Sequence, residues 1–186
     1  MPRINECGRT ALIPVRFRNA HKNGPGRFPE TLKRVFMKKE RYEKYYEANA
    51  HFRIENPNPR WAQKRGLVWD TPDCVIRAMA IAISCTWLEA FDYLTAKARA
   101  EYTVPNDGTR LRKWLEDGGA VWHHCKAEKG KKRMTVKEFA EKHPKGRFVI
   151  SIANHECACV DGIVMDAWNP GAKAVVGYLD MANFKL

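Results

Sequence analysis

The chain has 186 residues, of which 45% are hydrophobic and 29% are charged. This length suits one domain with an appendage, and the apolar content is enough for a packed core rather than a disordered chain. No run of 18 or more apolar residues is present, so a membrane-spanning helix is not expected, and the basic start lacks the apolar core of a signal peptide. These features favour a cytoplasmic protein whose six cysteines stay reduced.

The positive charge is concentrated in the first third of the chain. Residues 1–66 hold 16 Lys and Arg against 6 Asp and Glu, a net charge of +10, whereas residues 67–186 hold 17 against 15, a net charge of +2. We therefore expect a basic N-terminal extension over 1–66 and a nearly neutral domain over 67–186. Clustered positive charge attracts nucleic acid or an acidic protein surface, although it can also serve solubility alone.

One amphipathic helix is expected in this extension, from about residue 31 to residue 48, before a turn-rich hinge at residues 55–66. Its basic side chains are the candidate partner-binding residues: Lys38, Lys39, Arg41 and Lys44. The neighbouring tyrosines could stack on bases, or they could dock the helix onto the domain. These tyrosines are Tyr42, Tyr45 and Tyr46.

The domain begins with a helix that should be buried. Asp73 follows Pro72 and is a good N-cap, and the segment CVIRAMAIAIS that comes next has Arg77 as its only charged residue. A helix that is apolar almost all round is a buried one. Three further helices are expected. Those at residues 86–101 and 135–143 each begin with a capping box, and the third lies at residues 109–115.

Short strands are expected in the second half of the domain, at residues 120–125, 147–153, 156–160, 163–168 and 174–179. The pair Asp161-Gly162 is typical of the tight turn that joins two antiparallel strands. Helices followed by an antiparallel meander predict an α+β domain.

Cys74 is a candidate nucleophile because it lies in the first turn of the buried helix. The free N–H groups and the dipole at a helix start lower the pKa of a thiol, and the same N–H groups can face an oxyanion. Asp73 works against this, since a neighbouring negative charge raises the thiol pKa unless the carboxylate is engaged in capping. The alternative is an inert buried cysteine.

His155 and Asp166 are candidate partners of Cys74. If the Asp161-Gly162 turn sets the register, His155 lies opposite about Trp168, and Asp166 falls within diagonal reach on the same face. A carboxylate there can accept a hydrogen bond from one ring nitrogen and leave the other nitrogen facing Cys74. Asn169 is the fallback for this orienting role.

Three segments give a family resemblance. The run DCVIRAMAIAI, the strand G-x-F-V-I-S-x-x-x-H and the segment V-D-G-x-V-x-D-x-W-N resemble papain-like-fold cysteine peptidases, above all small bacterial and phage-type members with a Cys–His–Asp triad. The likeness covers about residues 69–180. It implies a helical half packed on an antiparallel sheet, with Cys74 as nucleophile, His155 as general base and then acid, and Asp166 as orienter. A phage-type member would act in the host cytoplasm.

The sequence departs from papain at one position of the oxyanion hole. Val68 stands where papain has a glutamine, so the Cys74 backbone N–H is the best remaining candidate donor. The predicted function is hydrolysis of peptide, isopeptide or side-chain amide bonds, and no cofactor is expected. The basic arm would engage a partner, or it would cover the cleft as a pro-segment. The alternative is an inactive scaffold of the same fold that binds nucleic acid or an acidic protein.

A zinc site is a further alternative, because the tract HECAC at residues 155–159 and the pair His123-His124 hold possible ligands. Zinc needs four converging ligands, and cysteines two residues apart fall on one face of a strand. We therefore expect no metal, and we expect Cys157 and Cys159 to line the core of the sheet.

Overall fold

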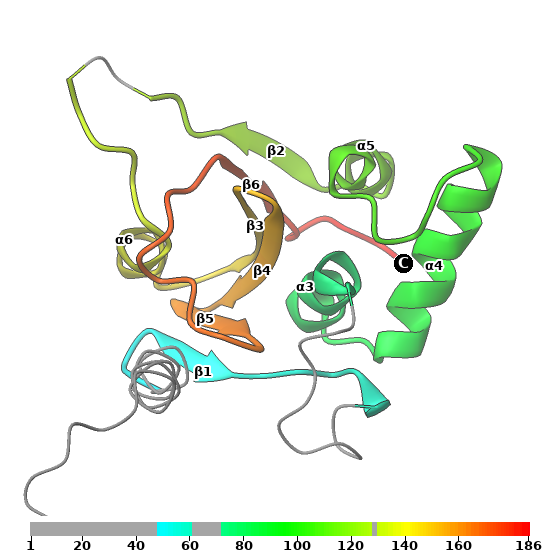
Figure 1. Ribbon diagram of the computed structural model, residues 1–186, viewed down its shortest axis with the longest axis horizontal. Helices are drawn as coiled ribbons and strands as arrows, with labels where there is room; N and C mark the ends of the chain where they lie inside the picture. Colours follow the sequence, from blue (N-terminus) through cyan, green and yellow to red (C-terminus); the bar gives the residue numbers. More distant parts are fainter. Residues whose placement is uncertain (1–47, 61–71, 128–129) are drawn as a thin grey trace, which may run out of the picture.

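The computed structural model describes residues 48–60, 72–127 and 130–186 (Figure 1). This part of the chain is α+β, with four helices and one six-stranded sheet. The helix expected from about residue 31 lies outside the described residues, and so do the candidate partner-binding residues Lys38, Lys39, Arg41 and Lys44.

The sheet is mixed rather than purely antiparallel. Its strand order is β1-β5-β4-β3-β6-β2, and the strands are β1 (Phe52–Ile54), β2 (Val121–His124), β3 (Arg147–Ile152), β4 (His155–Val160), β5 (Ile163–Asp166) and β6 (Gly177–Asp180). Strands β2 to β6 pair antiparallel as expected, but β1 runs parallel to β5 at one edge. The sequence assigns residues 52–54 to the extension, yet they are part of this sheet.

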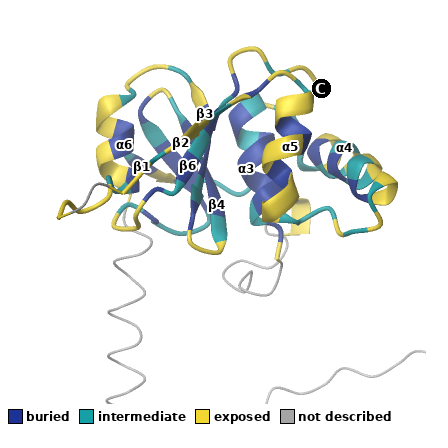
Figure 2. Ribbon diagram, turned by 90° about the horizontal axis from the view of Figure 1, so that it is seen from above, coloured by how far each residue is buried: buried dark blue, intermediate teal, exposed yellow. Residues whose placement is uncertain are grey.

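The helices lie on both faces of the sheet (Figure 2). They are α3 (Cys74–Ile83), α4 (Trp87–Ala100), α5 (Gly108–Asp117) and α6 (Val136–Lys142). Helix α6 covers one face and α3 covers the other; α4 packs on α3, and α5 lies beside α3 against β2 and β6. Among the described helices no single one is long and apolar enough to cross a membrane, although α3 and α4 pass that test as a pair bent by 119°.

The core is divided by the sheet into two clusters. On β3, Val149 faces the cluster around α3, whereas Phe148 and Ile150 face the cluster around α6. This alternation is the period-two pattern of a strand buried on both faces. Cys157 and Cys159 are buried in the α6 cluster, so the prediction that they line the core is confirmed.

Local sequence signals account for the starts of two helices and for one turn. Capping boxes open both α4 and α6, as expected. Asp161 and Gly162 both have positive φ angles, 49° and 77°, and directly join β4 to β5 so that Val160 lies opposite Ile163. Positive φ at both central residues is the geometry for which Asp-Gly is preferred in hairpins.

The Thr135→Ala variant should lower the free energy of unfolding by about 1 kcal/mol, because it removes the hydroxyl that caps α6. That oxygen accepts the N–H of Glu138 at 3.2 Å. Urea unfolding measures the change, and Thr135→Ser is the matched control because it keeps the hydroxyl. Equal loss in both variants would show that the threonine methyl, not the cap, matters.

Candidate active site

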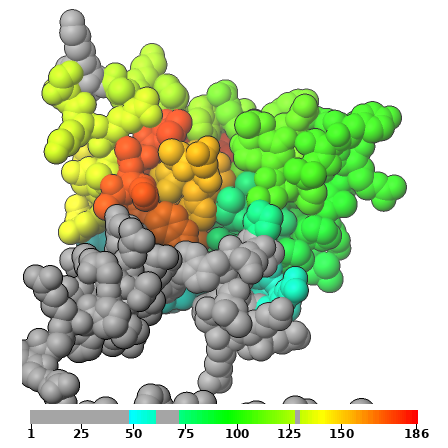
Figure 3. Space-filling model, viewed as in Figure 1, coloured from blue at the N-terminus to red at the C-terminus, as the bar shows by residue number. Residues whose placement is uncertain are grey.

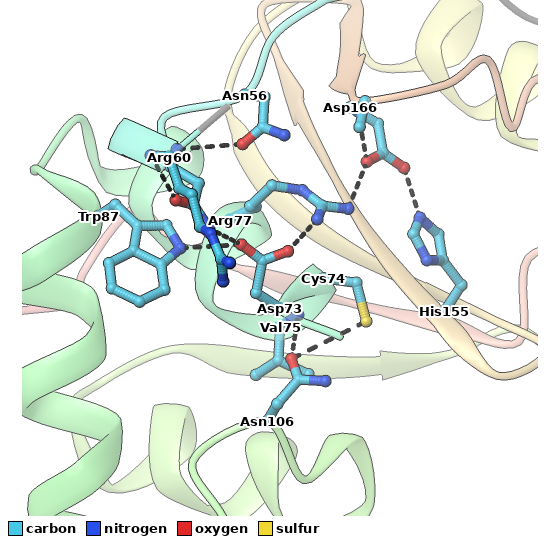
Figure 4. Close-up of polar contacts among 12 residues, drawn as sticks. Asn56, Arg60, Asp73, Cys74, Val75, Arg77, Trp87, Asn106, His155 and Asp166 are labelled. Carbon is cyan, nitrogen blue, oxygen red and sulfur yellow. Dashed lines mark hydrogen bonds and ion pairs between the residues drawn. The ribbon is translucent and has the colours of Figure 1, made fainter. Parts of the chain in front are cut away.

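The structure brings Cys74, His155 and Asp166 together at the end of the sheet (Figure 4). Cys74 is the first residue of α3, His155 the first of β4 and Asp166 the last of β5. His155 Nε2 hydrogen bonds to Asp166 Oδ2, and the imidazole lies beside the Cys74 thiol, close enough for each group to shift the pKa of the other. Because Nε2 is held by Asp166, the other ring nitrogen, Nδ1, is left for Cys74, as a nucleophile–base–orienter arrangement requires.

Electrostatics at this site favour a charged pair. Burial alone would raise the pKa of Cys74, but the hydrogen bonds from His155 and the backbone N–H of Glu156, with the charges of His155 and Arg77, hold it below its ordinary value. Burial opposes charge on His155 too, yet its bonds to Asp166 and Cys74 raise its pKa to about 9. The lowered thiol pKa shifts Cys74 toward the thiolate, and the raised imidazole pKa shifts His155 toward the imidazolium.

Cys74 differs from every other described cysteine. Burial raises the pKa of Cys85, Cys125, Cys157 and Cys159, and it takes Cys159 to about 12. At all four of these thiols burial is the dominant influence on the pKa. The described chain therefore holds five free cysteines, of which Cys74 alone has a lowered pKa.

The prediction that the Asp73 side chain caps α3 is wrong. Asp73 occupies the N-cap position, but its carboxylate makes no cap hydrogen bond and instead accepts from Arg77, Asn58 and Trp87. These tertiary donors offer a buried carboxylate more than a single backbone N–H can. The carboxylate is thus engaged, although not by capping.

Asn106 caps the helix in place of Asp73. Its Oδ1 accepts the N–H of Val75 at 3.0 Å and lies 4.0 Å from Cys74 Sγ. Figure 4 shows the amide group of Asn106 beside the sulfur. The sequence shows Asn106 only as part of a turn, 32 residues after Cys74, and no local pattern could have linked the two.

Glu156 is a second residue that the sequence did not single out for this site. Its side chain is 7% exposed and faces the start of α5, where its Oε1 would lie 3.1 Å from a Cβ added to Gly108. Within the described residues Oε2 has no hydrogen-bond partner. Burial, together with the negative charge of Cys74, raises the pKa of Glu156 to about 8, which favours the neutral form of this carboxyl group over the charged one.

The remaining candidates lie elsewhere or are engaged differently. The Asn169 side chain accepts the N–H of Gly171 at 2.9 Å in its own turn, while Asp166 is the residue that contacts His155. The centres of the His155 and Trp168 rings lie 5.0 Å apart, which agrees with the expectation that these two residues lie opposite each other. In the part of the chain that the structure describes, no group of three or more His, Cys, Asp and Glu side chains could hold a metal ion.

Comparisons with known proteins found no relative. No family model, no curated protein and no solved structure matches the chain. The chemistry of the site therefore has to be inferred from the geometry of its own residues.

Proposed function

We propose that the protein is a cysteine hydrolase of papain-like fold that cleaves peptide, isopeptide or side-chain amide bonds. The observation that carries the proposal is the contact of Cys74 with His155, itself held by Asp166, together with the lowered pKa of that one thiol. A structural cysteine needs neither a histidine partner nor a lowered pKa, and burial alone would act in the opposite direction.

The reaction would pass through a thioester. The Cys74 thiolate attacks the amide carbonyl carbon, and the His155 imidazolium gives its proton to the leaving amine as the C–N bond breaks. Neutral His155 then takes a proton from water, whose oxygen attacks the thioester carbonyl. Loss of the Cys74 thiolate releases the carboxylic acid. Asp166 keeps the imidazole oriented through both steps and stabilises its charged form.

Two donors near Cys74 would stabilise the oxyanion of the tetrahedral intermediate. One is the backbone N–H of Cys74 at the start of α3, as expected from the sequence. The other is the side-chain amide nitrogen of Asn106, because Oδ1 of that group is already fixed by the N–H of Val75. Asn106 would then supply a donor that Val68, which lies outside the described residues, cannot.

The basic arm suggests a second candidate function. Residues 1–66 carry a net charge of +10, which favours capture of nucleic acid or of an acidic protein surface. In the hydrolase this arm would bring the enzyme to its substrate or to a cytoplasmic partner. In the rival case, a catalytically inactive binding module, capture is the whole function and the Cys74 site is a remnant.

Iodoacetamide labelling of the wild-type protein from pH 4 to pH 9, followed for each cysteine by mass spectrometry, tests the hydrolase. Since the pKa of Cys74 is lowered, we expect it to label first and to remain reactive below neutral pH until the pH falls through its pKa. Cys85, Cys125, Cys157 and Cys159 are internal controls, because their raised pKa values predict slow labelling at pH 7. A Cys74 that labels only as an ordinary thiol would refute the proposal.

A further inference from the structure

Arg77 is the one charged residue of the buried helix α3, and its side chain is only 6% exposed. A buried guanidinium is costly unless its charge and its N–H groups are matched. Arg77 meets this requirement for its charge and for its two Nη groups, which join two buried carboxylates, one on each side, while its Nε–H has no partner among the described residues. Nη1 donates to Asp73 Oδ1, and Nη2 donates to Asp166 Oδ1 at 3.2 Å (Figure 4).

The Asp73 end of this link is anchored from outside α3. Asp73 Oδ2 accepts Nδ2–H of Asn58 at 2.6 Å and Nε1–H of Trp87, from the start of α4, at 3.1 Å. Asp73 is 2% exposed and Asn58 5% exposed, so the bond between them is shielded from bulk water, whereas the Trp87 bond is half-buried. The carboxylate of Asp73 is therefore held by donors from three different parts of the chain.

The Asp166 end of the link meets the catalytic histidine. Asp166 Oδ1 accepts from Arg77 and from the backbone N–H of Ala167 at 2.7 Å, and Oδ2 is left to bond His155. The backbone carbonyl of Asp166 also accepts the N–H of Glu55 at 3.0 Å. With Oδ1 fixed by two donors, the carboxylate cannot rotate away from the imidazole without breaking both bonds.

We infer that Asn58, Trp87, Asp73 and Arg77 form a positioning bridge that aims Oδ2 of Asp166 at His155. The inference rests on the proposed function, since it assigns a role to the surroundings of the same triad. It makes Arg77 a positioning residue that acts through Asp166. It also makes residues 55–58 part of the catalytic unit, although the sequence places them in the extension.

The bridge can be tested at its far end, where substitutions touch none of Cys74, His155 and Asp166. Asn58→Ala and Trp87→Phe each remove one donor to Asp73, and the phenylalanine keeps the stacking of Trp87 on Phe91. The matched control is Tyr93→Phe on the same helix, which removes the hydrogen bond from Tyr93 Oη to the carbonyl of Trp114, at 2.8 Å, and touches nothing in the bridge. Urea unfolding of each variant shows what it costs in stability.

The first readout is the pKa of His155, measured by NMR titration of the imidazole in the folded protein. Loosening of Asp166 weakens the hydrogen bond that raises this pKa, so we expect it to fall by about half a unit in Asn58→Ala and by less in Trp87→Phe. The second readout is the pH profile of Cys74 labelling. Its acid limb should move to higher pH by a similar amount, so that labelling at a given acidic pH becomes about threefold slower. Arg77→Lys should shift both readouts further, because an ammonium lacks the planar fork that holds two carboxylates.

Each result has a distinct meaning. If Asn58→Ala and Trp87→Phe lose stability as Tyr93→Phe does but keep the wild-type pKa of His155, the bridge has only a structural role and the inference is overturned. If the pKa of His155 shifts in the two variants and not in the control, the inference holds. Failure of the proposed function has a different signature, a wild-type Cys74 that does not label below neutral pH, and the His155 titration decides the inference in that case too.

Discussion

His155→Ala should leave Cys74 almost inert to iodoacetamide at pH 6. The alanine removes the hydrogen bond and the positive charge that oppose the effect of burial on the thiol, so the pKa of Cys74 should return to about 8.5 or higher. At pH 6 less than about 1% of such a thiol is ionised. The base and acid of the proposed reaction are lost with the same side chain, so amide hydrolysis should fall by at least about 1000-fold.

The matched control for this variant is His124→Ala, because His124 is exposed on β2 and takes no part in the site. Its labelling profile should coincide with that of the wild type. A His155→Ala protein that still labels at Cys74 along the wild-type pH profile would contradict the pairing of the two residues, whatever its effect on stability.

Cys74→Ala should abolish hydrolysis while leaving the fold and the basic arm unchanged. The side chain is small and lies at the edge of the core, so its loss removes the nucleophile with little change in packing. Residual hydrolysis should be at least about 1000-fold below that of the wild type. A fluorogenic peptide-amide library measures the activity, and fluorescence anisotropy with a labelled DNA oligonucleotide measures binding over a series of salt concentrations.

Charge reversal in the arm is the complementary variant. Charge reversal to glutamate should weaken binding of the DNA oligonucleotide and reduce the salt dependence of that binding, while cleavage of a short peptide stays intact. The residues replaced are Lys38, Lys39, Arg41 and Lys44. If the wild-type protein cleaves nothing and the charge-reversed protein loses all binding, the binding module is the better description. If Cys74→Ala still hydrolyses amides at the wild-type rate, Cys74 is not the nucleophile.

The features that the sequence predicted are those that neighbouring residues determine. The capping boxes of α4 and α6 and the turn at Asp161-Gly162 depend on residues three or fewer positions apart, so they can be identified from the chain itself. That turn then sets the register of β4 and β5, and the register brings Asp166 to His155. The contact between His155 and Asp166 could therefore be predicted from the preference of Asp-Gly for tight hairpin turns, applied to the two strands that the turn joins.

The features that the sequence missed depend on distant partners. Strand β1 is three residues long, too short to show the alternation of a strand, and its only described sheet partner, β5, comes more than a hundred residues later. Asp73 has the local pattern of a cap, but Arg77, Asn58 and Trp87 compete for its carboxylate. Asn106 and Glu156 reach Cys74 only through the packing of α3 against the sheet and the start of α5.

The parallel pairing of β1 with β5 has a consequence for the synthesis of the protein. Arg53 lies opposite Met165, 112 residues later, so β1 leaves the ribosome about 5 to 20 s before its partner strand exists. Closing so long a loop is also a slow and late step in folding. Since Asp166 ends β5 and its backbone carbonyl accepts the N–H of Glu55 beside β1, the proposed triad of Cys74, His155 and Asp166 can form on a growing chain only after nearly the whole domain has been made.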